Sequence, residues 1–281
     1  MLKRTLIIGF VAVVGITGNA RANDEPAKNA NLANPTVVIT AQRDGYTIAG
    51  LVTHWQDVKS FKHGIALFPG RPGIMRLHVE DGQPRFELAG NFLTRTRRHW
   101  LDAETLVVVV DAPSDTWATF SQSFRETPRY GADVAALLKD VAGQYPVGEW
   151  TFVGTSEGSI SALHAARMNP SLAKRTILTS SLFSPTRHGP GLSSVSWKDY
   201  PKSLLWVHHE NDPCKYTTYR EAKHYAKKTG APLLTVRDSG PWRGGACEAH
   251  TSHGFVGVER ETVLAMRAWV KTGSVPGDVA P

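Results

Sequence analysis

The chain has 281 residues, with 32 lysines and arginines against 25 acidic residues and a formal net charge of +7. This length suits one large α/β domain or two small domains. The positive charge is modest and the sequence has no Lys/Arg block. Both observations argue against a nucleic-acid-binding surface, so we expect no nucleic-acid partner. The local cluster of Arg95, Arg97 and Arg98 is expected on a solvated helix face.

Residues 1–22 have the pattern of a secretory signal peptide. A basic start precedes an apolar run over residues 5–18, and Ala20-Arg21-Ala22 is an A-x-A cleavage signal. The run is short for a spanning helix, which needs about 20 residues. We therefore predict cleavage after Ala22, a periplasmic or secreted location, and no stable membrane insertion after cleavage. An uncleaved membrane anchor is the alternative. The mature chain would have 259 residues and a net charge of +4.

Strand patterns begin after a polar segment, residues 23–35, which is expected to form a flexible lead to a single domain of residues 36–281. The clearest strand is TLVVVV at residues 105–110, because a continuous Val-rich run is typical of a strand buried on both faces. The predicted strands are residues 36–40, 46–55, 64–68, 105–110, 150–153, 175–179, 203–208 and 232–236.

Helical patterns lie between these strands. Strands and helices alternate from about residue 64, which indicates βαβ units and a mostly parallel sheet with helices on both faces. The first two strands are expected to form an antiparallel edge. Residues 75–88 predict a hairpin around Asp81-Gly82. The predicted helices are residues 91–101, 130–142, 156–168, 216–228 and 257–270.

Ser156 is the candidate nucleophile, in the Gly-x-Ser-x-Gly of residues 154–158. By itself this pattern recurs by chance in roughly one chain of this length in ten. Here a predicted strand precedes it and a predicted helix follows it, which is the strand–turn–helix of a nucleophile elbow. The tight turn requires small residues on either side of the serine, and Gly154 and Gly158 meet that requirement.

A serine nucleophile needs a base, and the base needs an acid that orients it. Asp212 follows the strand at residues 203–208, and His253 directly precedes the last predicted helix. We predict these two residues as acid and base, with Glu210 as the alternative acid and His250 as the alternative base.

Five segments of the sequence resemble the α/β-hydrolase superfamily over roughly residues 36–272. They are LFPGRPG at 67–73, VVVVDAPSD at 107–115, VGTSEGSISA at 153–162, VHHENDPC at 207–214 and SHGF at 252–255. The resemblance implies the α/β-hydrolase fold and hydrolysis of an ester or related acyl bond. The turn that carries the acid usually has glycine where this chain has His209.

The oxyanion hole of such an enzyme needs two backbone N–H groups. The resemblance places one at Glu157, directly after the nucleophile. The second is expected at Arg71, although this chain has Pro69-Gly70 where the superfamily usually has His-Gly. A backbone donor tolerates that difference. The Arg71 side chain is expected to be solvated, with contact to an anionic substrate group as the alternative.

Cys214 and Cys247 are the two cysteines of the chain. An exported protein meets an oxidising compartment, which favours a disulfide between them, and two buried thiols are the alternative. A bridge would tie the loop of Asp212 to the loop of His253. It would close a loop of about 32 residues, for a stabilisation on the order of 3–4 kcal/mol.

The pocket around the nucleophile is expected to include Asp115 and Trp117, which follow a strand at its carboxyl end. A structural turn is the alternative for this segment. The stretch between residues 179 and 203 is too short for a separate lid domain. We expect it to form an open rim together with the 75–88 hairpin, which favours small or medium substrates.

These observations predict an exported serine hydrolase that acts on a small-molecule acyl substrate through Ser156, His253 and Asp212. The chemistry needs no cofactor. The eleven histidines show no metal-ligand spacing with carboxylates on one element, so no metal site is predicted. A peptidase or amidase with the same triad is one alternative, and a catalytically silent binding protein of the same fold is another. The sequence leaves the oligomeric state open.

Overall fold

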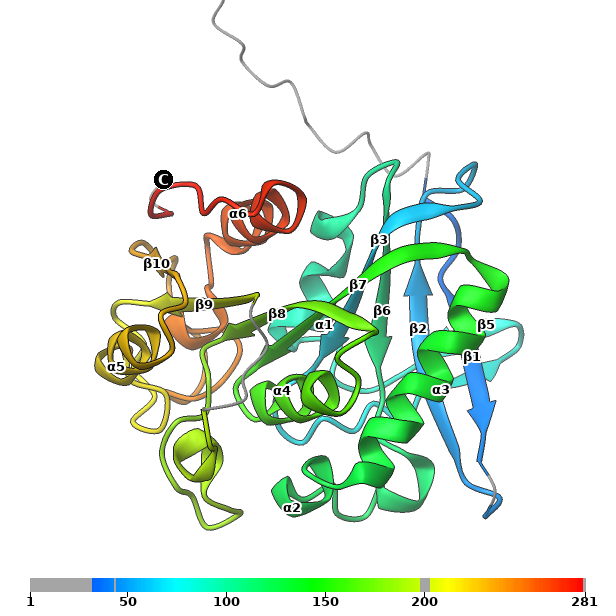
Figure 1. Ribbon diagram of the computed structural model, residues 1–281, viewed down its shortest axis with the longest axis horizontal. Coiled ribbons are helices and arrows are strands. Elements are labelled where there is room, and N and C mark those ends of the chain that lie inside the picture. The colour runs from blue at the N-terminus through cyan, green and yellow to red at the C-terminus, as the bar shows by residue number, and fades with distance from the viewer. Residues whose placement is uncertain (1–31, 43, 198–202, 280–281) are drawn as a thin grey trace, which may run out of the picture. The chain divides into compact units, whose positions relative to one another are not determined.

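The central element of the computed structural model is an eight-stranded sheet with the strand order β1-β2-β6-β3-β7-β8-β9-β10 (Figure 1). The structure describes residues 32–42, 44–197 and 203–279. The predicted signal peptide, and the predicted lead as far as residue 31, lie outside the described residues. The strands of this sheet are β1 Thr36–Ala41, β2 Thr47–Thr53, β3 Phe61–Phe68, β6 Thr105–Val110, β7 Val147–Thr155, β8 Ala173–Thr179, β9 Leu204–His209 and β10 Leu233–Val236.

The sheet is parallel except at one edge. There β1 pairs with β2, and β2 pairs with β6, in antiparallel register. The remaining neighbours are parallel, so the carboxyl ends of β3, β7, β8 and β9 share one edge of the sheet. The predicted antiparallel edge and the mostly parallel sheet are confirmed.

The Val-rich strand β6 shows why the sheet is covered on both faces. Its residues are all buried, and successive side chains of a strand point to opposite faces. Val108 and Val110 join one hydrophobic core, whereas Val107 and Val109 join the other. Helices must therefore close both sides.

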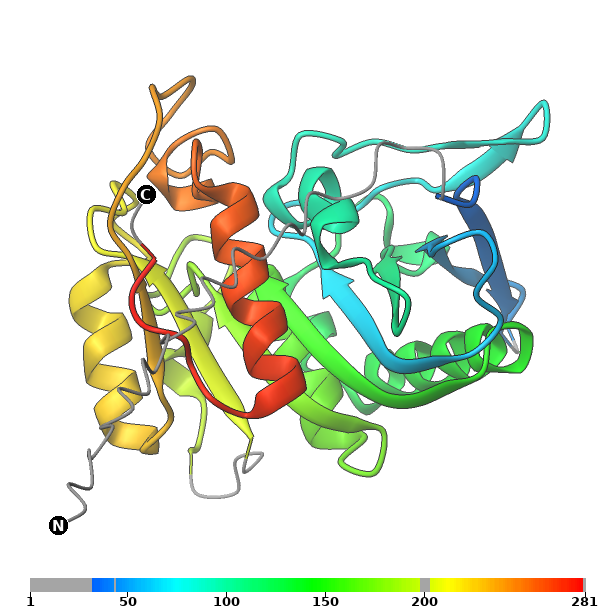
Figure 2. The same cartoon turned by 90° about the horizontal axis from the view of Figure 1, so that it is seen from above.

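Five helices supply this cover. On one face lie α3, Pro128–Gln144, α4, Gly158–Met168, and α5, Tyr219–Thr229. On the other lie α1, Phe92–Thr96, and α6, Glu259–Thr272. Figure 2 shows α3, coloured green, and α1, coloured teal, on opposite sides of the strands. None of the helices in the described part of the chain is long and apolar enough to span a membrane. The short helices are α2, Gln122–Arg125, and the 3₁₀ turns η1 Arg97–Trp100, η2 Ser114–Thr116, η3 Gly191–Ser194 and η4 Ser252–Gly254.

The predicted hairpin consists of β4, His78–Glu80, and β5, Gln83–Arg85, which pair in antiparallel register. Asp81 and Gly82 form its turn, both with positive φ, as the Asp-Gly signal predicts. Residues 75–77, directly before this hairpin, are held by the buried Asp111 just after β6. Its carboxylate accepts hydrogen bonds from the N–H groups of Met75 and Leu77 at 2.6 and 2.8 Å.

The basic cluster is not a solvated helix face, which corrects the expectation from sequence. The Arg95 side chain is only 17% exposed and pairs with Glu259 at 3.0 Å. It also donates to the carbonyl groups of Ala249 and Gly254, at 3.0 and 2.8 Å. Arg97 is half-buried, and only Arg98 is exposed. Within this cluster, Arg95 therefore connects α1 to the loop that precedes α6.

Cys214 and Cys247 form a disulfide, with an S–S distance of 2.03 Å and a sequence separation of 33 residues. Cys214 belongs to the turn after β9, and Cys247 belongs to the long loop between β10 and α6. The bridge predicted from the sequence is therefore present, and it joins two loops at the carboxyl end of the sheet.

Reduction of this disulfide is expected to lower the Tm by roughly 5–15 °C, because it opens a loop whose closure contributes about 3–4 kcal/mol. Thermal melts with and without reductant measure the shift. The control is the double variant Cys214→Ser/Cys247→Ser. Its Tm should equal that of the reduced wild type and should not change when reductant is added. Equal Tm values for the oxidised and reduced wild type would contradict this expectation.

Candidate active site

Ser156 occupies the sharp turn between β7 and α4, with a backbone φ of 53°. This left-handed conformation is unusual for a residue other than glycine. Its N–H donates to the Thr179 carbonyl at 3.1 Å, and its own carbonyl accepts from the Ser159 N–H at 3.0 Å. The turn places the serine at the carboxyl end of β7 and at the amino end of α4.

The glycines on either side of Ser156 are required by close packing. A Cβ atom on Gly154 would lie 2.3 Å from the Gly158 carbonyl oxygen. A Cβ atom on Gly158 would lie 2.1 Å from the carbonyl oxygen of Phe68, at the end of β3. The pattern Gly-x-Ser-x-Gly thus corresponds to a strand–turn–helix in which any larger residue would collide with the backbone.

Asp212 and His253 come together as the sequence predicts. The Nδ1 atom of His253, in η4, lies 3.0 Å from Oδ2 of Asp212 in the turn after β9. Thr217 adds a hydroxyl that donates to the same oxygen at 2.9 Å. The Cys214 N–H donates to the other carboxylate oxygen at 2.9 Å. The Asp212 carboxylate is thus oriented by its own turn as well as by the His253 imidazole.

A second imidazole adjoins the same carboxylate. His208 Nε2 lies 3.3 Å from Asp212 Oδ2 and 2.5 Å from the Thr217 carbonyl oxygen. Burial alone would raise the pKa of Asp212, but the charge and hydrogen bonds of His253 and His208 outweigh burial and hold that pKa well below its usual range. Asp212 is therefore ionised at neutral pH and can accept the Nδ1–H of His253.

Neither the alternative acid nor the alternative base takes part in the contact between Asp212 and His253. Glu210 pairs with Arg237 at 3.0 Å on the surface. His250 is exposed and borders the same pocket as His253, whereas the Asp212 carboxylate bonds to His253. His209 fills the position that is usually glycine; its Nε2 bonds to the Asp238 carbonyl and its Nδ1 accepts the Asn211 N–H, each at 3.0 Å.

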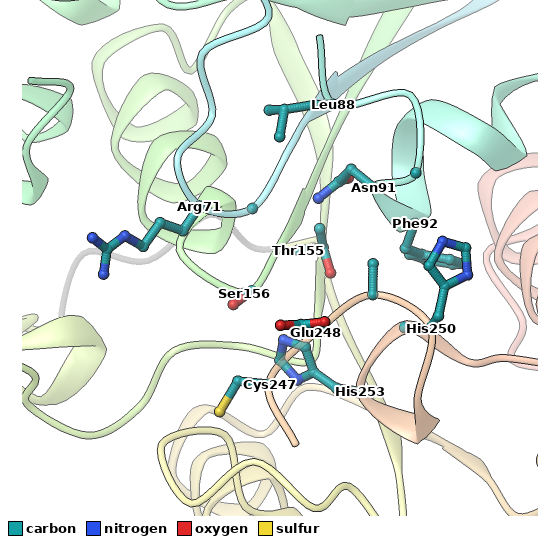
Figure 3. A pocket seen from close by; sticks show the side chains of 14 residues that line it. Arg71, Leu88, Asn91, Phe92, Thr155, Ser156, Cys247, Glu248, His250 and His253 are labelled. Carbon is teal, nitrogen blue, oxygen red and sulfur yellow. The ribbon is translucent and has the colours of Figure 1, made fainter. Parts of the chain in front are cut away.

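A pocket of about 350 Å³ contains both Ser156 and His253 (Figure 3). Its walls come from the turn after β3, from the segment that precedes α1, and from the loop that ends in η4. The Arg71 side chain is exposed and points away from Ser156 and His253. The lining residues are Gly70, Arg71, Leu88, Gly90, Asn91, Phe92, Thr155, Ser156, Cys247, Glu248, Ala249, His250, His253 and Gly254.

The turn after β3 packs directly against the serine. A Cβ atom on Gly70 would lie 3.1 Å from Ser156 Cβ and 3.1 Å from the Thr155 carbonyl oxygen. Within the described residues, neither the Arg71 N–H nor the Glu157 N–H donates to a protein acceptor. These two N–H groups belong to separate segments, which pack together at the serine.

Part of the predicted pocket, and part of the predicted rim, are corrected. Asp115 forms an ion pair with Arg129, and Trp117 donates its Nε1–H to the Ala112 carbonyl at 3.1 Å. Neither residue lines the pocket of Ser156. Leu88, at the end of the hairpin segment, does line it, but the described residues of the stretch after β8, 180–197, do not. The loop at residues 247–250 supplies that wall instead.

Two hydroxyl groups near His253 were not predicted from sequence. Thr217 Oγ1 lies 3.2 Å from His253 Nδ1, and Ser180 donates its hydroxyl to the His253 carbonyl at 2.7 Å. Both residues are buried. Neither lies in a motif, so no local signal in the sequence marks them.

Comparisons with protein-family models and with curated proteins find no match. Solved structures do match. A cold-adapted esterase from an Arctic intertidal metagenomic library is 13% identical with a TM-score of 0.57, covering 88% of this chain and 97% of that one. XC6422 from Xanthomonas campestris, described as an a/b serine hydrolase without lid, is 14% identical with a TM-score of 0.53, covering 89% and 98%.

A third similar structure is oligopeptidase B from Trypanosoma brucei with covalently bound antipain. It is 14% identical with a TM-score of 0.54, and the match covers 89% of this chain but 38% of that one. At these identities the likeness concerns the fold. The strand order, the helices on both faces, the elbow at Ser156 and the short connection after β8 agree with it. The chain therefore has the α/β-hydrolase fold, and its described residues include no large lid domain.

Proposed function

We propose that this protein is an exported serine hydrolase that cleaves a carboxylic ester or a related acyl bond. The observation that carries the proposal is that Ser156, on its strained turn, lines one pocket with His253, whose Nδ1 lies 3.0 Å from the Asp212 carboxylate. The disulfide supports export, because disulfides persist mainly in oxidising compartments.

The mechanism assigns one role to each of the three side chains. His253 accepts the proton of the Ser156 hydroxyl through Nε2 while Ser156 Oγ attacks the acyl carbon. Asp212 orients the imidazole and stabilises its charged form. His253 then protonates the leaving group, and water hydrolyses the acyl-enzyme by the same route.

The negative charge of the tetrahedral intermediate falls on the former carbonyl oxygen. The N–H groups of Glu157 and Arg71 are the proposed donors to that oxygen, and the amino end of α4 adds partial positive charge. The pocket of about 350 Å³ and the absence of a lid domain over the described residues favour small or medium acyl substrates.

Amide hydrolysis is the second candidate, and the likeness to the fold of oligopeptidase B is the observation that favours it. The same triad serves both reactions, because the acyl-enzyme is common to them. We favour ester hydrolysis over amide hydrolysis because the fold also resembles those of an a/b serine hydrolase without lid and of an esterase.

A fluorophosphonate probe is expected to label the wild-type protein and to leave Ser156→Ala unlabelled, because Ser156 Oγ is the group that would attack phosphorus. Gel fluorescence and intact mass measure the labelling. The control is Ser193→Ala, a serine on the exposed surface of η3, which should label like wild type. An unlabelled but folded wild-type protein would refute the proposal.

A substrate panel is expected to separate the two candidate reactions. Short acyl esters should be hydrolysed with kcat/KM at least about 100-fold above matched aminoacyl amides, with Ser156→Ala inactive on both. Initial rates on paired ester and amide substrates with the same acyl group provide the measurement. The reverse order would favour the peptidase.

The depressed pKa of Asp212 predicts a pH dependence of stability. In the unfolded chain an aspartate titrates near pH 4, whereas in the folded protein the carboxylate stays ionised to lower pH. Its contribution is complete above about pH 4 and is lost as the pH falls toward the folded pKa, by up to about 1.4 kcal/mol per pH unit. Denaturant unfolding of wild type and Asp212→Asn measures it. Parallel pH curves for the two proteins would contradict the assignment.

A further inference from the structure

A buried ion pair lies directly behind the turn of Ser156. The Arg125 guanidinium, at the end of α2, approaches the Glu157 carboxylate with Nη2 and Oε2 3.6 Å apart. The two side chains are 1% and 7% exposed. A pair buried this deeply loses most of its hydration and adds little net stability. Its location beside the nucleophile therefore calls for a reason other than stability.

Arg125 connects two segments that meet at the serine. Its Nη1 donates to Ser161 Oγ, inside α4, at 2.7 Å. Its Nη2 donates to the Pro72 carbonyl, in the turn after β3, at 2.8 Å. The guanidinium stacks over the Phe120 ring, with its carbon 3.8 Å from the centroid. One rigid, planar group thus sets the spacing between the turn after β3 and the start of α4.

The second oxygen of Glu157 is held from the same short helix. Gln122 lies three residues before Arg125, on the same face of α2. Its Nε2 donates to Glu157 Oε1 at 3.0 Å, and its Oε1 accepts the Gly191 N–H at 2.9 Å. Both carboxylate oxygens of Glu157 therefore have partners, and Gln122 and Arg125 are both fully buried.

We propose that Arg125 is a positioning residue that holds the two oxyanion donors in register through Glu157 and Pro72. The donors are the N–H groups of Glu157 and of Arg71, which directly precedes Pro72. They belong to separate segments, and donors aimed in advance at the developing charge stabilise it most. This inference rests on the proposed serine-hydrolase function and adds the device that sets its oxyanion hole.

The test removes the ion pair without leaving a lone buried charge. In Arg125→Met/Glu157→Met both side chains keep similar volume, and the Glu157 N–H itself remains. We expect kcat for a small activated ester to fall roughly 10- to 100-fold, because loss of a whole oxyanion donor costs about 100- to 1,000-fold and displacement costs less. KM should stay within about twofold, and the pH profile of kcat/KM should not shift, since His253 and Asp212 are untouched.

The matched control is Arg175→Met/Glu149→Met, which removes an ion pair from β7 and β8 close to their amino ends, away from Ser156. It should keep the wild-type kcat. Rates are taken per active site, titrated with fluorophosphonate, and Tm is recorded for each protein. A lower Tm with unchanged kcat in the Arg125 double variant would show a purely structural pair and overturn the inference.

Arg125→Lys provides the test if the double variant does not fold. Lysine keeps the charge but cannot bond to Pro72, Ser161 and Glu157 together, so kcat should fall several-fold at unchanged KM. An unchanged kcat for Arg125→Lys would overturn the inference alone. A folded wild-type protein that hydrolyses no ester or amide would overturn the proposed function and this inference with it.

Discussion

The left-handed backbone of Ser156 is the constraint on which the rest of the site depends. A non-glycine residue in this conformation costs about 1–3 kcal/mol, and it persists only where the surroundings leave no other choice. Here β8 holds its N–H, and the contacts of Gly154 and Gly158 leave no space for a side chain. The strained turn places the Ser156 hydroxyl at the edge of the sheet, in the same pocket as the loop that carries His253.

The loop that carries His253 is distant from Ser156 in sequence, and three sets of interactions hold it in place. Ser180, directly after β8, bonds to the His253 carbonyl, and the disulfide ties Cys247 to the turn of Asp212. Arg95 holds two further carbonyl groups, one on either side of His253. Much of the surface of this loop is exposed, yet the end that carries His253 is connected to β8, to the turn of Asp212 and to α1. The imidazole therefore keeps its orientation without being part of a regular element.

Most of the fold could be predicted because its signals are local. The apolar run at residues 105–110 must be buried on both faces, and the Asp-Gly turn favours positive φ. Both signals are independent of the rest of the chain. Ser156, Asp212 and His253 could also be singled out from the sequence. An elbow has a recognisable pattern, and so do the end of a strand and the start of a helix. Their catalytic roles remain proposals. The two cysteines were paired correctly because the chain has only two.

The contacts around the site could not be predicted in the same way, because they depend on the distance between segments far apart in sequence. The four-residue helix α2 has no periodic pattern, yet it carries Gln122 and Arg125 into the core. Arg95 looked like a surface residue because an arginine is usually solvated, and only the loop at residues 249–254 makes burial favourable. Asp115 was expected in the pocket from its position after a strand, but Arg129 holds it elsewhere.

Arg125 compensates the charge of the buried Glu157 carboxylate beside Ser156, and this affects the field that a substrate meets. Arg125 neutralises Glu157, while His208 and His253 adjoin Asp212. Beside the serine, the N–H groups of Glu157 and Arg71 have no protein acceptor within the described residues, and the amino end of α4 adds its dipole. These groups present partial positive charge without a mobile ion. Such fixed dipoles need little reorganisation when an oxyanion forms, so they are suited to stabilising a charge that appears only in the transition state.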